Sequence, residues 1–207
     1  MSMGESSISQ WLEALASREP TPGGGAAAAL CAATSASLLG MVAQYTTGDK
    51  WADRADRMRA VIDEAATVRA RAVALADDDA EAFAAVGAAY KLPRQTGEQQ
   101  DERRVAIQEA LIGAAGPPVR TGELAARLVV LAQELADTGN PNVLSDVAVA
   151  SSTARSALES AIVNIEINRA QIRDDVEAKR LAHVIEQFSR SIQAADQVTA
   201  VVRERVR

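Results

Sequence analysis

Apolar residues recur at intervals of three and four along most of the chain, which is the spacing of one helix face. One stripe reads Met58, Val61, Ala65, Val68, Ala72 and Leu75. A second reads Val147, Ala150, Ala154, Leu158, Ala161 and Ile165. A third, near the C-terminus, reads Leu181, Val184, Phe188, Ile192, Ala195, Val198 and Val202. The pattern predicts long helices that each bury one face.

Glycine, proline and capping residues divide this pattern into segments. The expected helices run from Ser6 or Ser7 to about Glu19, Gly25 to Tyr45, Ala52 to Tyr90 with a break allowed at Asp77–Asp79, Thr96 to Gly116, Thr121 to Gly139, Ser145 to beyond Ile165, and about Leu181 to Val202. We therefore predict an all-α bundle of six to eight helices, several long and Ala-rich, in a single domain over residues 1–207.

The composition supports helices that pack closely. Apolar residues make up 48% of the chain but aromatic residues only 3%, so Ala, Val, Leu and Ile must build the core. Residues 26–45 carry no charge over about the 20 residues that span a bilayer. Because they are mostly Ala, Ser, Thr and Gly, a helix buried within a bundle is favoured over a membrane span. This helix is too apolar for a monomer's surface, so we expect a homodimer.

The charge and cysteine content narrow the class of protein further. The net charge of −6 argues against a nucleic-acid partner, which requires a basic surface. A single cysteine, Cys31, rules out an internal disulfide framework and fits a reducing compartment. The polar start, Met1 to Gln10, lacks the pattern of a signal peptide. We expect a soluble cytoplasmic protein with no membrane partner.

The side chains available for chemistry are few. With one histidine, His183, and one cysteine there is no zinc constellation, no Ser-His-Asp triad and no Cys-His pair. His183 is interpreted as an ordinary helix residue, and no metal site is expected. Acid–base chemistry must fall to Asp, Glu, Lys or Tyr whose pKa is tuned by burial.

Two segments in the first half are candidate sites. Gly23, Gly24 and Gly25 open a helix, so a ligand carboxylate or a polar ring edge can approach its bare first amides. The alternative is a tight turn with close helix packing. Asp77–Asp79 interrupt an apolar helical run, and Asp79 shares a face with Phe83. The alternative there is a solvated helix face.

Two further candidates lie in the second half. Residues 139–146 read Gly-Asn-Pro-Asn-Val-Leu-Ser-Asp, which predicts either a capped helix junction or a polar pocket of Asn140, Asn142 and Asp146. Asn164 and Asn168 lie four apart on the helix that follows, and Asn164 is about 27 Å from Asp146 along the helix axis. Three interpretations follow. The Asn pair and Asp146 serve two ends of a long ligand, or a second subunit brings them together. Alternatively, the Asn pair only forms hydrogen bonds to neighbouring helices.

The ordered set of segments resembles the cyclodeaminase/cyclohydrolase family of folate enzymes. The matching segments, over roughly residues 5–175, are Pro22-Gly-Gly-Gly-Ala-Ala-Ala, Asp77-Asp-Asp-Ala-Glu-Ala-Phe83, Lys91-Leu-Pro-Arg94-Gln-Thr96, Arg104-Val-Ala-Ile-Gln-Glu-Ala-Leu111, Gly139-Asn-Pro-Asn-Val-Leu-Ser-Asp146 and Ala161-Ile-Val-Asn164-Ile-Glu-Ile-Asn168. No single motif is specific, but the order is. The resemblance implies a helical homodimer that binds a reduced folate without a metal or other cofactor.

The resemblance also implies one of two reactions at an amidine-like carbon. One hydrolyses 5,10-methenyltetrahydrofolate to 10-formyltetrahydrofolate, and the other cyclises 5-formiminotetrahydrofolate to the methenyl form with release of ammonia. At the matching positions it implies that Asp146 transfers protons or stabilises the cation, with Asp79 as a second acid. The implied substrate-binding residues are Gly23, Gly24, Gly25, Lys91, Arg94, Asn140, Asn142, Asn164 and Asn168.

Two departures from the family pattern keep other functions open. Ala26 stands where the family has Ser, and Ala148 where it has Gly. The alternatives are a folate-binding relative without catalysis and a helical interaction protein. The sequence does not separate cyclohydrolase from cyclodeaminase, although a chain without a transferase segment favours the cyclohydrolase.

Overall fold

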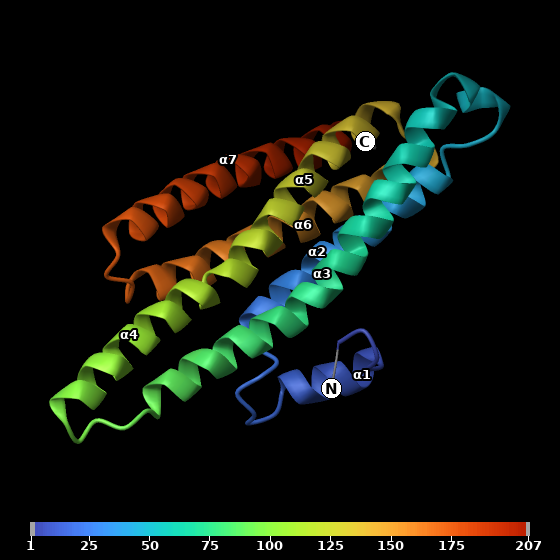
Figure 1. Cartoon of the computed structure of the whole chain (residues 1–207). Helices are drawn as coiled ribbons and strands as arrows, with labels where there is room; N and C mark the ends of the chain where they lie inside the picture. The colour runs from blue at the N-terminus through green and yellow to red at the C-terminus, as the bar shows by residue number, and fades with distance from the viewer. Residues whose placement is uncertain (1–2, 206–207) are drawn as a thin grey trace.

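The structure, a computed structural model, describes residues 3–205 and is an all-α bundle (Figure 1), which confirms the predicted fold class. Residues 1, 2, 206 and 207 of the predicted domain lie outside the described residues. The helices are α1 (Ile8–Leu15), α2 (Gly24–Gln44), α3 (Ala55–Tyr90), α4 (Gly97–Ala114), α5 (Gly116–Thr138), α6 (Leu144–Arg169) and α7 (Asp175–Arg205). Two 3₁₀ turns, η1 (Asp49–Arg54) and η2 (Pro141–Val143), precede α3 and α6.

Local sequence explains most of the helix starts. Ser7 and Thr96 each form a capping box, in which the hydroxyl accepts a hydrogen bond from a first-turn amide and Gln10 or Gln99 bonds back. Asn140 caps η2, its side chain accepting a hydrogen bond from the Asn142 amide.

Three predicted helix boundaries were wrong. The first helix ends at Leu15 rather than near Glu19. Pro117 and Pro118 do not lie in a connection between two helices but in the first turn of α5, which begins at Gly116. Proline is tolerated there because first-turn residues donate no amide hydrogen to the helix ladder. Ser145 does not cap α6, which begins one residue earlier, directly after η2. The break allowed at Asp77–Asp79 is absent, and α3 is continuous.

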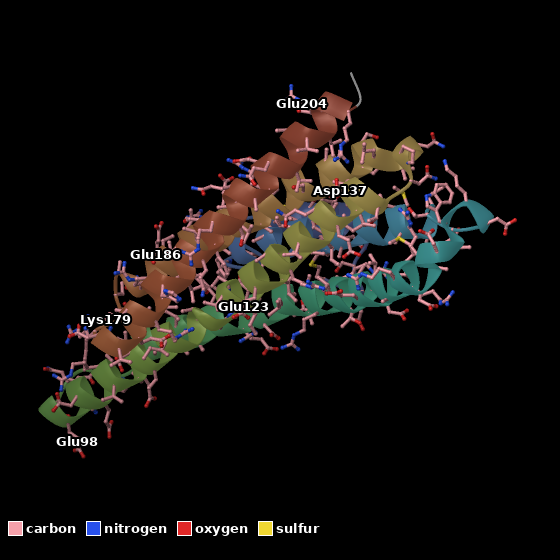
Figure 2. All side chains as sticks on the ribbon, turned by 90° about the horizontal axis from the view of Figure 1, so that it is seen from above. Glu98, Glu123, Asp137, Lys179, Glu186 and Glu204 are labelled. Carbon is pink, nitrogen blue, oxygen red and sulfur yellow. The ribbon has the colours of Figure 1, made fainter. Side chains whose placement is uncertain are left out.

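The long helices form two layers. α2 and α6 pack side by side, α3 and α7 flank them, and α5 packs on both from one side (Figure 1). The three predicted stripes lie inside: every residue named for α3 and α6 is buried, as are Leu181, Phe188, Ala195, Val198 and Val202 of α7. Charged side chains such as Glu123, Lys179 and Glu186 project outward from α5 and α7 (Figure 2). Ala, Val, Leu and Ile thus form most of the core, as the composition predicted.

The helix α2 is long and apolar enough to cross a membrane by length and composition, with a mean hydropathy of 1.8 in its most apolar window. In the bundle 61% of that window is buried. Ser35 is completely buried there, and its hydroxyl donates to the Ala150 carbonyl of α6 at 2.8 Å. The burial agrees with the prediction of a core helix.

Replacing Gly122 with alanine is expected to destabilise the bundle by about 1–3 kcal/mol, the usual cost of overpacking a core. Gly122 is buried on α5, and a Cβ there would overlap the ring of Phe188 on α7. Chemical denaturation of Gly122→Ala measures the loss. In a Phe188→Leu background the same glycine change should cost clearly less, and an equal cost in both backgrounds would contradict this packing.

Candidate functional site

A pocket of about 280 Å³ lies where α2 begins. Its walls come from the loop before α2 and from α2, α3, α4 and α6 with the turn that follows α6. The lining residues are Pro20, Thr21, Gly23, Gly24, Gly25, Asp79, Phe83, Val86, Tyr90, Leu111, Ala114, Asn164, Ile167, Asn168 and Gln171. The structure therefore brings together the three glycines, Asp79 and both asparagines of the predicted site.

Asp79 is the one charged residue among those lining residues. It lies on α3 against the first turn of α2, so close to Gly25 that a Cβ on that glycine would overlap its carboxylate. Burial raises the pKa of Asp79 above its ordinary value of 3.8, and a hydrogen bond from the Ala26 backbone amide partly offsets this. The pKa of this carboxyl is thus closer to neutral pH than that of an exposed aspartate, which suits proton transfer.

The other two aspartates of the cluster are engaged elsewhere. Asp77 accepts a hydrogen bond from the Met3 amide at 3.0 Å, and Asp78 pairs with Arg120 of α5 at 3.1 Å. Asp79 alone lines the pocket. The proposed alternative, a solvated acidic face, therefore fits Asp78 better than Asp79.

The start of α2 supplies bare backbone donors to the pocket. Gly23 is the N-cap and has no side chain to cap the helix, Gly24 is exposed, and the Ala26 amide of the same turn already bonds Asp79. The other amides of this turn stand at the positive end of the helix dipole. A polar or anionic ligand edge can therefore reach main-chain N–H groups beside Asp79.

Asn164 and Asn168 form the opposite wall on α6. The Asn164 side-chain amide donates to the Ser160 carbonyl at 2.7 Å, and a Cβ on Gly24 would lie 3.8 Å from that amide nitrogen. Asn168 donates to the carbonyls of Asn164 at 3.0 Å and of Ala114, the last residue of α4, at 3.3 Å. The predicted helix-to-helix bond is present for Asn168, and both side-chain oxygens remain available to a ligand donor.

Sequence reasoning placed Phe83 on the face of Asp79 but missed Val86 and the rim residues Tyr90 and Gln171 of the pocket. Phe83, Val86 and Tyr90 follow Asp79 at intervals of four, three and four, so they share its face of α3. This spacing was visible in the sequence and was the signal that could have found them. At the rim the Tyr90 hydroxyl donates to Gln171 Oε1 at 3.0 Å, and the Arg103 guanidinium lies 5.6 Å from the Tyr90 ring centroid.

The predicted residues at 140–146 lie at the other end of α2 and α6. Asn140 is buried, and its amide nitrogen donates to the Tyr45 carbonyl at 2.8 Å while its backbone N–H donates to the Thr46 hydroxyl at 2.9 Å. These bonds tie the end of α2 to η2. Asn142 is exposed and Asp146 half-buried, and within residues 3–205 no hydrogen bond or ion pair engages the Asp146 carboxylate.

The remaining predicted residues lie on the surface. Lys91 and Arg94 are exposed in the connection from α3 to α4, immediately after Tyr90 of the pocket. His183 is exposed on α7, with Gln187 Nε2 3.0 Å from its Nε2, as expected of an ordinary helix residue. No group of three His, Cys, Asp or Glu that could hold a metal is found within the described residues.

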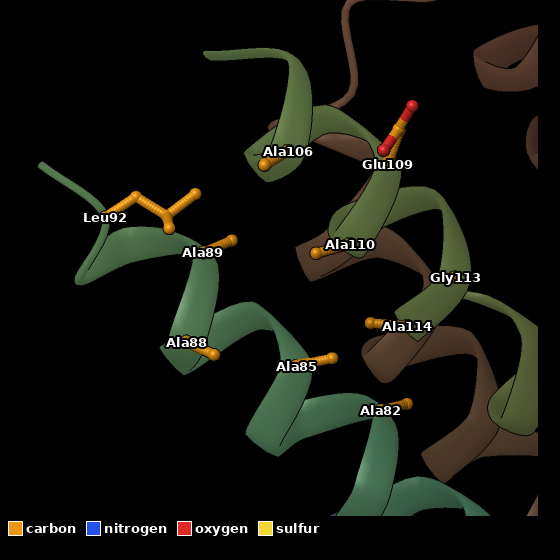
Figure 3. Close-up of a pocket in the computed structure, with 10 residues that line it drawn as sticks. All are labelled: Ala82, Ala85, Ala88, Ala89, Leu92, Ala106, Glu109, Ala110, Gly113 and Ala114. Carbon is orange, nitrogen blue, oxygen red and sulfur yellow. The ribbon is translucent and has the colours of Figure 1, made fainter. Parts of the chain in front are cut away.

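A second hollow lies between the end of α3 and α4 (Figure 3) and is larger, about 540 Å³. Most of its lining is alanine, with Glu109 the one charged residue among the lining side chains. It lacks the converging polar groups that orient a small ligand. The pocket with Asp79 is therefore the better candidate site.

The comparisons with known proteins agree on one group. The family model for formiminotransferase-cyclodeaminase matches residues 7–187. A methenyltetrahydrofolate cyclohydrolase from Methylorubrum extorquens is 37% identical over 172 residues, which is 83% of each chain. The formimidoyltransferase-cyclodeaminase of Rattus norvegicus is 37% identical over 185 residues, but the match spans 89% of this chain and only 34% of the rat protein.

A solved structure shares the whole architecture. The crystal structure of a formiminotetrahydrofolate cyclodeaminase from Thermotoga maritima superposes with a TM-score of 0.89 at 27% identity and covers 99% of both chains. Because the match covers 99% of each chain, the helices around the pocket have counterparts in that protein.

Proposed function

Because the chain belongs to the formiminotransferase-cyclodeaminase family, we propose that it is a folate one-carbon enzyme acting at the amidine-like carbon of a reduced folate. The observation that carries this proposal is the Asp79 carboxyl, set with a raised pKa against the open start of α2. The first candidate reaction is hydrolysis of 5,10-methenyltetrahydrofolate to 10-formyltetrahydrofolate, the activity named for the Methylorubrum relative.

The pocket offers each group that this reaction requires. The methenyl carbon is cationic, so a carboxylate beside it stabilises the bound substrate by charge. As Asp79 takes a proton from the attacking water, it lowers the barrier to the tetrahedral adduct, and it returns the proton when the ring C–N bond breaks. The Asn164 and Asn168 oxygens are acceptors for pterin N–H groups, and Phe83 and Val86 cover the ring faces.

The size of the pocket matches part of the substrate. The pocket volume of about 280 Å³ is slightly below the usual range of ligand pockets, roughly 300–1,000 Å³. It suits the bicyclic head, and the aminobenzoyl-glutamate tail must extend beyond it. Lys91 and Arg94 follow Tyr90 at the rim, and we place the tail's carboxylates on them by charge.

The cyclodeaminase reaction is the second candidate, since the Thermotoga neighbour carries that name and matches over its full length. There the same carboxyl would protonate the departing amine. We further propose that the enzyme is a cytoplasmic homodimer of single-domain chains, uses no metal or cofactor, and has no nucleic-acid or membrane partner. The acidic balance supports the absence of a nucleic-acid partner, and the single Cys31 supports a reducing compartment.

Purified protein assayed with both substrates tests the proposal. Loss of methenyl absorbance faster than the uncatalysed hydrolysis is the expected result, and ammonia release from the formimino compound measures the second reaction. The ratio of the two kcat/KM values decides whether the enzyme is a cyclohydrolase or a cyclodeaminase. Lack of turnover with both, while a reduced folate still binds, would replace the proposal with a non-catalytic folate-binding protein.

A further inference from the structure

A hydrogen bond between two side chains spans the rim of the pocket with Asp79. The Tyr90 hydroxyl at the end of α3 donates to Gln171 Oε1, in the turn that follows α6, at 3.0 Å. Both residues line the pocket, Tyr90 is 44% exposed, and Gln171 is exposed. An exposed bond of this kind adds little to stability, because water offers both groups equivalent partners. A ligand that extends beyond the pocket must pass these two side chains.

Helix α4 holds the main chain of both rim residues. The Arg103 guanidinium donates to the Tyr90 carbonyl at 3.1 Å and lies 5.6 Å from the Tyr90 ring centroid. Gln108 Nε2 donates to the Gln171 carbonyl at 3.1 Å, and Gln108 Oε1 accepts from the Arg173 amide at 2.7 Å. Neither Arg103 nor Gln108 is among the lining residues. The two rim side chains therefore project from a fixed main chain, which reduces the entropy lost when a ligand binds.

The rim bond also decides which end of the Gln171 side chain is free. Because Oε1 accepts from Tyr90, the remaining polar group is Nε2, which can only donate and makes no hydrogen bond within residues 3–205. Inside the pocket the polarity is reversed: Asp79 offers its carboxyl group, and Asn164 and Asn168 offer oxygens because their amide groups donate to main-chain carbonyls. The pocket therefore fits a ligand with donors on its head and an acceptor beyond the head.

The position of Tyr90 along α3 indicates which part of a ligand reaches the rim. Asp79 and Tyr90 are 11 positions apart, which is about 16 Å along the helix axis. Phe83 and Val86 line the pocket between them. A ligand whose reacting carbon meets Asp79 can therefore reach the rim only with groups beyond its bicyclic head. In a reduced folate these groups are an aromatic ring and then the carbonyl that joins this ring to the glutamate.

We propose that Gln171 is a specificity-determining residue, whose Nε2 donates a hydrogen bond to the benzoyl carbonyl of the substrate tail, and that Tyr90 is the residue that positions it. The Tyr90 hydroxyl holds Oε1 and so directs Nε2 toward the ligand. Lys91 and Arg94 follow Tyr90 in the chain, which agrees with their proposed place at the tail carboxylates. The inference rests on the proposed function for the identity of the ligand, and it expects pterins without the tail to bind weakly.

Binding measurements on two substitutions of Gln171 test this subsite. Gln171→Glu keeps an oxygen that accepts from Tyr90 but loses the donor, and Gln171→Met loses both without adding a charge. Isothermal titration with tetrahydrofolate and with a methyl-tetrahydropterin, which has the same head and no tail, measures the two affinities. Each variant should bind tetrahydrofolate about 5- to 10-fold more weakly, the equivalent of one lost hydrogen bond, and bind the tail-less pterin as the wild type does.

The two substitutions distinguish the subsite from its alternatives. If Gln171 only tied the turn to α3, Gln171→Glu would bind tetrahydrofolate normally. If repulsion of the tail carboxylates caused the loss, Gln171→Met would bind it normally. Either result would overturn the proposal, as would equal losses with both ligands. Gln133→Glu on α5, an exposed residue outside the pocket lining, makes the same change of charge and should bind both ligands as the wild type does.

Tyr90→Phe tests the positioning role of the tyrosine. It keeps the ring and removes the hydroxyl that orients Gln171, so the affinity for tetrahydrofolate should fall about 2- to 3-fold with no change for the tail-less pterin. An unchanged ratio of the two affinities would show that Tyr90 does not position the glutamine.

The same titrations separate this inference from the proposed function. A wild type that binds neither ligand would reject both. A wild type that binds tetrahydrofolate without turnover of either substrate, with selective losses in the Gln171 variants, would reject the enzyme and support the subsite. Turnover by the wild type, with an unchanged ratio of affinities in these variants, would reject the subsite while the proposed function stands.

Discussion

Asp79→Asn is expected to lower turnover by about 10²–10⁴-fold, the usual contribution of a positioned acid–base group. The asparagine keeps the shape of the carboxyl and can still accept the hydrogen bond from the Ala26 amide. It can neither take up the proton of the attacking water nor offset the cationic carbon by charge. Steady-state kinetics with the methenyl substrate measures the loss.

Asp78→Asn is the matched control for this change. Asp78 precedes Asp79 in the sequence but pairs with Arg120 on the surface and does not line the pocket. A half-exposed ion pair of this kind contributes little to stability. Its variant should keep wild-type turnover, and an equal loss in both variants would attribute the effect to the acidic cluster as a whole.

The effect of Asp79→Asn on the stability of the fold should increase with pH. Because its pKa is raised in the folded protein, the folded state holds the proton more tightly than the unfolded state. Stability is therefore lost as pH rises from the ordinary value of 3.8 through the raised pKa. Asp79→Asn removes that loss, so its melting temperature should exceed wild type by more at pH 7 than at pH 4.

The activity should depend on the same titration. Hydrolysis requires the carboxylate as base, so kcat/KM of the wild type should fall toward acid with a midpoint above 3.8. The residual rate of Asp79→Asn should lack that limb. An unchanged acid limb in the variant would assign the titrating group elsewhere.

Gly25→Ala is the second change with a large expected effect. A methyl group there would overlap the Asp79 carboxylate, and the side chain must swing away to admit it. A displacement of about 1 Å at a reacting group can cost 10²-fold in rate. We expect kcat to fall about 10- to 100-fold, measured in the same assay as for Asp79.

Gly87→Ala on α3 controls for the loss of a helical glycine, because a Cβ there meets no atom within 4 Å. It should be slightly more stable than wild type, by about 0.5–1 kcal/mol, with unchanged turnover. Wild-type kcat in Gly25→Ala would show that the close approach of Asp79 to this glycine has no part in catalysis.

The sequence was sufficient for the fold because helix signals are local. The three apolar stripes, the capping box at Thr96 and the stop at Gly139 are each determined by a few neighbouring residues. The errors are also local: proline disrupts the interior of a helix but is favourable in its first turn, where Pro117 and Pro118 lie. The family resemblance, carried by the order of six segments, is confirmed by the comparisons.

The pocket was only partly predictable because it depends on which helices become neighbours. Gly25 and Asp79 are 54 positions apart, and no local pattern shows that α3 lies across the start of α2. The same holds for Asn164, which comes beside Gly24 only through the packing of α6 on α2. Asn140 was predicted to bind the ligand but instead has a structural role, because its hydrogen bonds to Tyr45 and Thr46 hold the far end of α2.

A crystal structure of the protein with a bound reduced folate tests the central claim most directly. The account predicts the pterin in the pocket at the start of α2, with its one-carbon position within hydrogen-bonding reach of Asp79 and its ring edge on Asn164 or Asn168. A folate bound with its one-carbon position away from every Asp79 carboxylate, for example in the alanine-lined hollow between α3 and α4, would contradict it.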